Sequence, residues 1–165
     1  MKSLTNSKLE LFITAIFLTV ISCGYSTRSL LPPHLKTVAI TAVENSTTQP
    51  GLAEELSLVL PRVFNSDRNL RVTSLENADL VVSITLTGYS RTAAAYDAEQ
   101  TISAYEISLA AQVEAQDQVR NEPFFSGTIS TRISYEPERK SEEDALSEAI
   151  EKLAREITRQ IITAW

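Results

Sequence analysis

The sequence has 165 residues and a formal net charge of −6, with 15 Lys and Arg residues against 21 Asp and Glu residues. This length is enough for one domain with a single hydrophobic core, and the acidic balance disfavours binding to the phosphate backbone of nucleic acids. Because Cys23 is the only cysteine, an intrachain disulfide is excluded, and acylation of Cys23 would leave no thiol for a cysteine-containing metal site.

The first feature along the chain is an apolar segment, residues 11–21, which has no charge and follows Lys2 and Lys8. Its length is typical of a signal peptide and is too short to span a bilayer comfortably. The segment ends in Val20-Ile21-Ser22-Cys23, where a small residue precedes the cysteine and an aliphatic residue stands three positions before it. This pattern resembles a bacterial lipobox, in which the chain is cut before the cysteine and the cysteine is acylated.

We therefore predict a lipoprotein signal peptide over residues 1–22 and attachment to the membrane through acylated Cys23. The alternatives are a plain secretory signal with an incidental cysteine and an amino-terminal transmembrane anchor. Residues 23–34 contain a Pro-Pro pair and show no apolar periodicity, so we expect an extended lipidated tether. The single histidine, His34, is expected to be an exposed loop residue at the end of this tether.

A first helix is predicted from Gly51, because apolar residues then recur every three or four positions as far as Phe64. Glu54 and Glu55 would complement the helix dipole in its first turns. Pro61 removes a backbone donor and clashes with the preceding turn, so we expect a kink or a break near residue 60.

Short strands are predicted on both sides of this helix. Alternation around Val38 and Ile40 indicates a strand in residues 35–43, which a polar loop follows over residues 44–50. A second strand follows the helix near residues 70–72. Because strand, helix and strand succeed one another at short spacing, a crossover should place the two strands parallel.

Three longer strands and a second helix are predicted in the rest of the chain. Alternation of apolar and polar residues marks strands in residues 80–87, 105–114 and 125–135, and the looser residues 90–100 are expected to form a hairpin tip. Ser141 with Asp144 three positions later resembles a capping box, and an apolar stripe then predicts a helix that reaches the chain end.

These elements predict an α+β domain over residues 35–165. It has a mostly antiparallel four- to five-stranded sheet and two helices packed on one face, in the order β-α-β-β-β-β-α. The other sheet face is expected to stay uncovered and to carry short, mostly uncharged side chains. They are Ser83, Thr85, Thr87, Ser108, Gln112, Ser126, Thr128 and Ser130. Such a face suits packing in a confined polar space, such as the lumen of a β-barrel; an ordinary solvated face is the alternative.

Little in the sequence supports catalysis. The nucleophile-elbow, zinc-protease and phosphate-binding glycine patterns are all missing, and acidic residues 142–144 are best interpreted as first-turn acids of the second helix. We therefore expect a protein that is not an enzyme and that uses no metal and no cofactor. Among the basic residues, Arg91, Arg139 and Lys140 are candidates to meet a phosphate group, and plain solvated charges are the alternative.

From Cys23 onward the chain resembles the LptE family of lipopolysaccharide-assembly lipoproteins. The matching stretches are Cys23-Gly24-Tyr25, Leu31-Pro32-Pro33-His34-Leu35-Lys36-Thr37-Val38-Ala39-Ile40, Glu44-Asn45-Ser46-Thr47, Gly51-Leu52, Phe64, Asp67-Arg68-Asn69-Leu70, Ala78-Asp79-Leu80, Gly88-Tyr89, Tyr96-Asp97, Tyr105 and the terminal helix. The resemblance implies a two-helix sandwich that sits as a plug inside the LptD β-barrel, where it assists barrel assembly and the passage of lipopolysaccharide to the outer leaflet. Pro61 in the first helix and Asp97, near a basic position of better-known members, depart from the family pattern.

The expected function is therefore that of a lipid-anchored protein at the periplasmic face of the outer membrane. Its expected partner is an LptD-like barrel, and lipopolysaccharide is a candidate ligand of Arg91, Arg139 and Lys140. The alternative is an auxiliary or regulatory lipoprotein of another envelope machine, such as a peptidoglycan-synthase activator or the accessory lipoprotein of a lipid-transport ATPase. A hydrolase is a third alternative.

Overall fold

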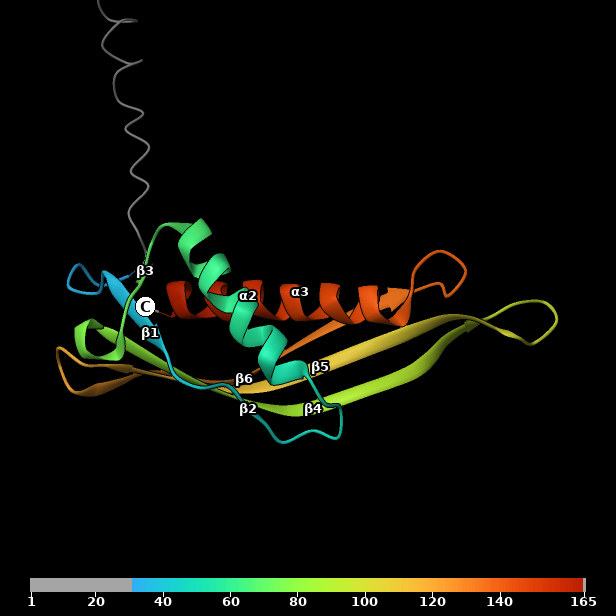
Figure 1. Ribbon diagram of the computed structural model, residues 1–165, viewed down its shortest axis with the longest axis horizontal. Helices are drawn as coiled ribbons and strands as arrows, with labels where there is room; N and C mark the ends of the chain where they lie inside the picture. Colours follow the sequence, from blue (N-terminus) through green and yellow to red (C-terminus); the bar gives the residue numbers. More distant parts are fainter. Residues whose placement is uncertain (1–30, 165) are drawn as a thin grey trace, which may run out of the picture.

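The computed structural model describes residues 31–164, so the predicted signal peptide, Cys23 and most of the tether lie outside the described residues. The described chain folds into one sheet, two long helices and a short 3-10 helix, η1 (Figure 1). In chain order the elements are β1 (Thr37–Ile40), β2 (Glu44–Asn45), α2 (Leu52–Asp67), β3 (Arg71–Val72), η1 (Leu75–Asn77), β4 (Leu80–Tyr96), β5 (Ile102–Asp117), β6 (Glu122–Tyr135) and α3 (Glu142–Thr163).

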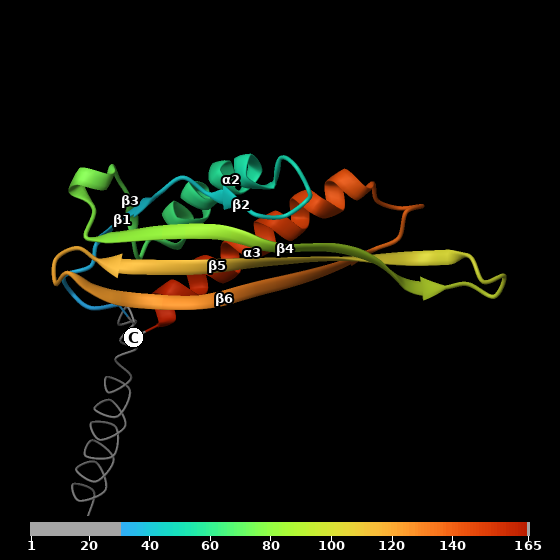
Figure 2. The ribbon, with the colours of Figure 1, turned by 90° about the horizontal axis from the view of Figure 1, so that it is seen from below.

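The sheet is mixed, with the strand order β3-β1-β4-β5-β6 and with β2 also paired to β4. β1 runs parallel to β3 and to β4, whereas β4, β5 and β6 form an antiparallel meander. Both helices lie on one face, and in the perpendicular view the strands pass in front of them (Figures 1 and 2). The predicted fold class and the parallel strands around the first helix are confirmed. The short β2 is an addition, because the sequence predicts only a loop there.

The β4–β5 hairpin is longer than the sequence predicts. β4 continues to Tyr96 and β5 begins at Ile102, so the tip is confined to residues 97–101 and reaches beyond the helical layer (Figure 1). The carboxylate of Asp97 accepts hydrogen bonds from the backbone N–H groups of Glu99 and Thr101, at 3.1 and 2.7 Å, which closes this turn. The prediction of a loose stretch from residue 90 is wrong, because this part of the hairpin is largely exposed and alternation gives no signal where neither face is buried.

The hydrophobic core lies between the two helices and the sheet face that they cover. The helices supply Leu52, Leu56, Val59, Leu60 and Phe64 from α2 and Ala145, Ala149, Ile150, Leu153, Ala154, Ile157, Ile161 and Ile162 from α3. Large side chains in this set stabilise the fold by about 1.5–3 kcal/mol each on transfer from water. Their spacing of three and four residues is the signal that predicts both helices.

Pro61 does not break α2, which continues from Leu52 to Asp67. Of the kink or break expected near residue 60, the break does not occur. Leu60 and Phe64, on either side of the proline, are both fully buried, so burial on the sheet holds the helix together across the missing backbone donor. The start of α3 follows its prediction: Ser141 Oγ accepts the backbone N–H of Asp144 at 3.0 Å and donates to the Asp144 carboxylate at 2.7 Å.

The segment before β1 is attached to the domain. Leu31 is only 6% exposed, and His34 Nε2 lies 2.6 Å from Oδ2 of Asp117 at the end of β5. The other oxygen of Asp117 accepts the backbone N–H groups of Val119 and Arg120, at 2.9 and 3.0 Å. The expectation of an exposed His34 is therefore wrong, and the described end of the tether follows the surface of the sheet.

A second aspartate fixes the start of β1. Oδ2 of Asp79 accepts the backbone N–H groups of Lys36 and Thr37, each at 2.9 Å, and the Thr37 hydroxyl at 2.8 Å. Burial alone would raise the pKa of Asp79, but these hydrogen bonds favour the carboxylate and leave its pKa below the ordinary value of 3.8. The Asp79 carboxylate thus accepts hydrogen bonds from the backbone N–H groups at the start of β1.

Candidate functional site

The uncovered face of the sheet is a grid of short side chains from β4, β5 and β6. Because β4 and β6 both pair with β5, each β5 residue on this face lies between one residue from each neighbour. The rows are Ser83–Glu114–Ser126, Thr85–Gln112–Thr128, Gly88–Ala110–Ser130 and Ser90–Ser108–Arg132. We call these four rows the polar face. Glu114 and Arg132 are its only charged residues.

The composition predicted for this face matches the rows except at Thr87, which falls in a break of register between Leu86 and Gly88. Within the second row, the hydroxyl of Thr128 donates to the amide oxygen of Gln112 at 2.9 Å. In the third row Gly88 has no side chain and Ala110 has one carbon, so the backbone is nearly bare at the centre of the face. A surface that approaches here can come close to the sheet without displacing long side chains.

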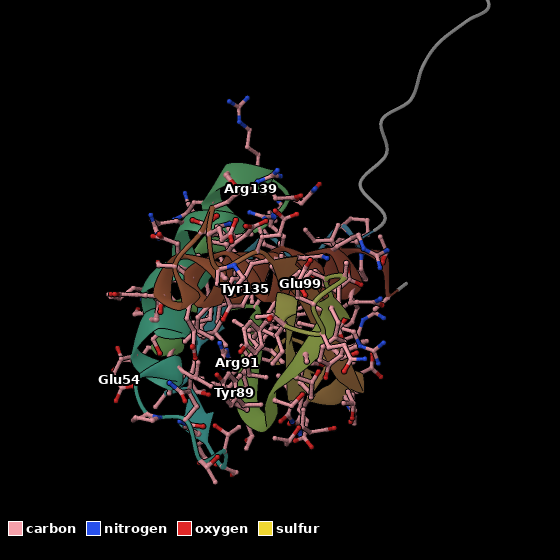
Figure 3. All side chains as sticks on the ribbon, turned by 90° about the vertical axis from the view of Figure 1, so that its right-hand side faces the viewer. Glu54, Tyr89, Arg91, Glu99, Tyr135 and Arg139 are labelled. Carbon is pink, nitrogen blue, oxygen red and sulfur yellow. The ribbon has the colours of Figure 1, made fainter. Side chains whose placement is uncertain are left out.

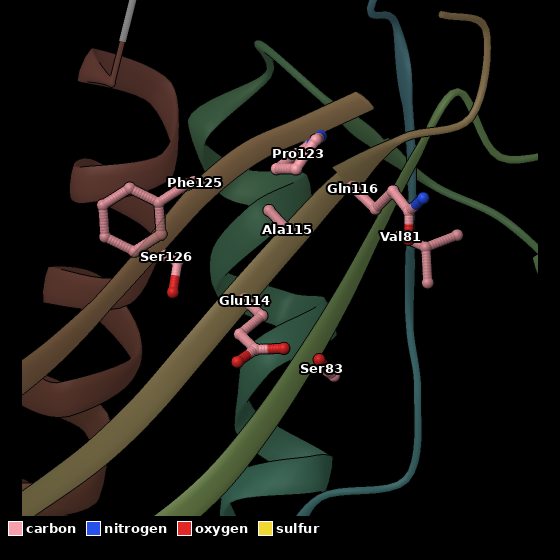
Figure 4. A pocket seen from close by; sticks show the side chains of 8 residues that line it. All are labelled: Val81, Ser83, Glu114, Ala115, Gln116, Pro123, Phe125 and Ser126. Atoms are coloured by element: carbon pink, nitrogen blue, oxygen red, sulfur yellow. The ribbon is translucent and has the colours of Figure 1, made fainter. Parts of the chain in front are cut away.

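A hollow of about 370 Å³ opens at the end of the polar face near the β5–β6 turn (Figure 4). Its lining includes Ser83, Glu114 and Ser126, and Figure 4 shows the Glu114 carboxylate on the strand between the two serines. Glu114 is the single acid of the lining, which otherwise consists of two serines, Gln116 and apolar side chains. The hollow is open to solvent, and its floor is the sheet itself.

The break of register at Thr87 reorients the rest of β4. Before it, Leu80, Val82, Ile84 and Leu86 point to the helices; after it, Gly88 pairs with Ala110 and Tyr89 with Leu109. One extra residue in a strand shifts the alternation of the side chains that follow. Tyr89 and Arg91 are thereby moved to the helix side of the sheet, where they meet the start of α3.

Arg91 joins three elements at this end of the molecule (Figure 3). Its Nε donates to the phenolic oxygen of Tyr135 at 2.7 Å and lies 3.1 Å from a carboxylate oxygen of Glu142. Its guanidinium carbon lies 3.6 Å from the centre of the Tyr105 ring, a cation–π arrangement. The hydrogen bond that Arg91 donates to Tyr135 raises the pKa of Arg91, so the group is a fixed positive charge.

Tyr89 borders the same cluster. Burial raises its pKa, and the nearby Glu142 carboxylate raises it further, so its hydroxyl stays protonated at neutral pH. The cluster therefore consists of three tyrosines, one cation and one carboxylate. It contains no histidine or thiol that could act as a base or nucleophile near pH 7.

The other two basic candidates lie in the loop between β6 and α3. Arg139 extends into solvent with 80% of its side chain exposed, and its Nε lies 3.0 Å from Glu136 (Figure 3). Lys140 pairs with Glu148 of α3. Both bases line a hollow of about 260 Å³ with Tyr135, the residue that Arg91 contacts. The fold thus brings all three candidates to one end, each beside an acidic residue.

Sequence reasoning missed the residues that surround Arg91. The only local signal for the break of register before Arg91 is Gly88, because an isolated glycine in a strand often marks a bulge. The contact with Tyr135 joins residues 44 positions apart, and that separation leaves no trace in a local pattern.

Within residues 31–164, no helix is long and apolar enough to cross a membrane. In the same range no group of three or more His, Cys, Asp or Glu side chains is arranged to hold a metal ion. The features that stand out are therefore surfaces: the polar face and the end that carries the basic candidates.

The structure defines a small α+β domain with two helices on one face of a mixed sheet. The chain belongs to the LptE lipopolysaccharide-assembly family, whose model matches residues 35–164. Its role is accordingly in lipopolysaccharide assembly at the outer membrane, as a non-catalytic envelope lipoprotein. The predicted family and function are confirmed, and the hydrolase alternative falls away.

Solved structures share the fold at low sequence identity. A hypothetical protein from Chlamydia trachomatis superposes with a TM-score of 0.59 at 15% identity, covering 77% of this chain and 95% of that one. The uncharacterized lipoprotein B from Nitrosomonas europaea gives a TM-score of 0.55 at 16% identity, covering 80% and 84%. A minor lipoprotein from Acinetobacter baumannii gives 0.51 at 18%, covering 77% and 92%. Comparison with curated proteins gives no match.

Proposed function

We propose that this domain, held at the periplasmic face of the outer membrane by acylated Cys23, binds inside an LptD-like β-barrel and supports its assembly and the export of lipopolysaccharide. The observation that carries the proposal is the polar face. It is flat, uncovered and nearly free of charge, whereas freely solvated sheet faces usually carry more Lys and Glu. A barrel lumen is lined by polar side chains and would accept such a face.

Purification of the acylated chain in mild detergent tests the partner. The expected result is that a large outer-membrane β-barrel is recovered with it. In the variant Gln112→Arg, a long charged side chain at the centre of the polar face should lower this recovery while thermal unfolding stays unchanged. Leu58→Arg is the matched control, because Leu58 lies on α2 with 72% exposure and should tolerate the same change. Recovery of no barrel with the unmodified chain would contradict the proposal.

The lipid anchor is tested separately at Cys23. Several acyl chains, at about 0.8 kcal/mol per buried CH₂, give durable attachment to a bilayer. Cys23→Ser should therefore move the protein from the membrane fraction to the soluble fraction. A Cys23→Ser protein that stays with membranes after a high-salt wash would rule out acylation as the anchor.

The end of the molecule that carries Arg91, Arg139 and Lys140, here called the basic end, would contact the phosphate groups of lipopolysaccharide. Arg139 and Lys140 are the direct candidates, and Arg91, already engaged by Tyr135 and Glu142, is the third. Because each base has a carboxylate beside it, a phosphate has to compete with an existing ion pair. The double variant Arg139→Gln with Lys140→Gln should weaken capture of purified lipopolysaccharide. Arg155→Gln, on the outer side of α3, is the control that should not, and equal capture by both variants would argue against direct contact.

A further inference from the structure

Within residues 31–164, β6 forms a free edge of the sheet. It pairs with β5 on one side and is the last strand in the order β3-β1-β4-β5-β6, and Figure 2 shows its other side open, with α3 crossing behind. An unpaired edge presents a row of backbone N–H and C=O groups that another strand can bind. Which β6 residues present them follows from the ladder.

The direction of the backbone groups is fixed by the hydrogen bond from Gln118 N to Asp79 O, at 2.8 Å. This bond makes Leu80 and Asp117 a non-hydrogen-bonded pair of the β4–β5 ladder. Because directions alternate along a strand, the odd-numbered β5 residues from Leu109 to Ala115 bond to β6. Their partners are the odd-numbered residues Phe125, Gly127, Ile129 and Thr131.

The even-numbered residues of β6 consequently direct their N–H and C=O groups away from the sheet. Ser126, Thr128 and Ser130 have exposed side chains as well. An independent contact agrees: the ammonium group of Lys152 donates to the backbone oxygen of Arg132 at 2.8 Å, from outside the ladder. Lys152 thus binds the backbone oxygen at one end of the edge, and no other described residue pairs with the outward backbone groups of residues 126–130.

Residues 126–130 carry neither a charged side chain nor a proline, two of the features that protect an edge strand. Such strands are normally guarded by charged side chains, above all lysine, or are very short. Here residues 123–131 form a run of nine without a charge in a chain that is 22% charged. Glu122 precedes the run and Arg132 ends it, so an incoming antiparallel strand meets opposite charges at its two ends.

We propose that the free edge of β6, over residues 126–130, binds an extended segment of the partner barrel as an additional strand. The inference rests on the proposed barrel partner and specifies how part of it is held. On the side of the polar face, the added strand would carry small polar residues and an acidic residue opposite Arg132. On the helix side it would carry apolar residues, which would contact the half-buried Phe125 and Ile133. Main-chain hydrogen bonds would supply the affinity, and side chains on the two faces the selectivity.

Amide hydrogen exchange tests this inference on the acylated chain, alone and with its co-purified barrel. The amides of Thr128 and Ser130 should exchange quickly in the protein alone and at least about tenfold more slowly in the complex, as expected for a newly hydrogen-bonded ladder. Gly127 and Ile129 bond to β5 in both states and serve as internal controls. If barrel is recovered but Thr128 and Ser130 exchange equally fast in both states, the inference is overturned and the barrel partnership stands.

Two variants at Thr128 distinguish the contribution of the main-chain N–H to barrel binding from that of the side chain. Thr128→Pro removes an outward N–H, a change that edge strands tolerate, together with the hydroxyl that donates to Gln112. It should lower barrel recovery about tenfold, equivalent to about 1.4 kcal/mol. Thr128→Val also lacks the hydroxyl but keeps the N–H and the side-chain shape, and it should bind nearly as well. Thermal unfolding confirms that both are folded. Equal recovery by the two variants would overturn the inference.

Two other outcomes also count against the inference that a barrel segment pairs with β6. If no barrel is recovered with the unmodified chain, the proposed function fails and the added strand fails with it. If the unmodified chain is instead a dimer that Thr128→Pro dissociates, the edge is occupied by a second copy, and the assignment to a barrel segment is wrong.

Discussion

Arg91 Nε lies 2.7 Å from the phenolic oxygen of Tyr135, and this contact joins the far half of β4 to the end of β6. Since the guanidinium also stacks on Tyr105 and pairs with Glu142, Arg91 connects the hairpin to the start of α3. Beyond Ala93 and Tyr105, the β4–β5 hairpin pairs with no further strand of residues 31–164. The cluster holds the base of this projecting part to β6 and α3.

We predict that Arg91→Met lowers the free energy of unfolding by about 1–2 kcal/mol, because the cation–π contact and the hydrogen bond are both lost. The side chain of Arg91 is about one-third exposed, at 32%, which keeps the value at the lower end of that range. Tyr135→Phe should cost about 1 kcal/mol through loss of the acceptor. Urea unfolding of both single variants and the double variant gives their coupling, and strictly additive effects would show that the two side chains act independently.

A second prediction concerns acid stability. Burial alone would raise the pKa of Asp117, but hydrogen bonds from His34 and from the N–H groups of Arg120 and Val119 bring it below 3.8. A depressed carboxylate pKa contributes stability that is fully present above the unfolded pKa, near 4, and is lost as pH falls through the lower folded pKa. Asp117→Asn should therefore lower the free energy of unfolding by about 2 kcal/mol at pH 7 and by progressively less toward pH 3.

Urea unfolding at a series of pH values measures this difference. Glu138→Gln, at an exposed loop position, is the control and should match the unmodified protein throughout. A constant deficit of Asp117→Asn from pH 7 to pH 3 would mean that the carboxylate acts by shape and not by charge.

The contrast between Asp117 and the helices shows what a local pattern can predict. Apolar spacing in α2 and α3 and alternation in β4, β5 and β6 report burial, so the sequence predicts these elements and the polar face. The His34–Asp117 contact joins residues 83 positions apart, and neither residue has a neighbour pattern that indicates the other. Polar contacts between residues far apart in the chain are therefore not predictable from local sequence patterns.

The basic end of the molecule shows the same division. Arg139 and Lys140 could be placed in a loop before α3, since charge and capping signals are local. That Arg91 would reach the same end depends on one extra residue at Thr87, which changes the side of the sheet to which the following side chains point. Pro61 is the converse case: a strong local signal for a helix break is overridden by the burial of Leu60 and Phe64.

A third prediction follows from an unpaired hydroxyl. Thr131 of β6 is 6% exposed, and its Oγ1 has no hydrogen-bond partner among the described residues. A buried hydroxyl without a partner costs about 1–3 kcal/mol, whereas valine has nearly the same shape and no polar atom. Thr131→Val should raise the free energy of unfolding by about 1 kcal/mol. In the control Thr158→Val, a buried hydroxyl that donates to Ala154 O at 2.9 Å is removed, and no gain is expected.

The last prediction uses the helical proline. Pro61 lies inside α2 and cannot donate to the carbonyl of Ser57, one turn earlier, so the helix carries a missing bond in its middle. Pro61→Ala restores the backbone donor and introduces a better helix former, a gain of about 3 kcal/mol in an isolated helix. The substitution also raises the conformational entropy of the unfolded chain, a loss of about 1 kcal/mol of stability. The net expectation is an increase of about 1–2 kcal/mol in the free energy of unfolding, measured by urea titration. If the stability does not change, α2 must already bend enough at residue 61 to let water satisfy the Ser57 carbonyl, and the proline then costs the native fold nothing.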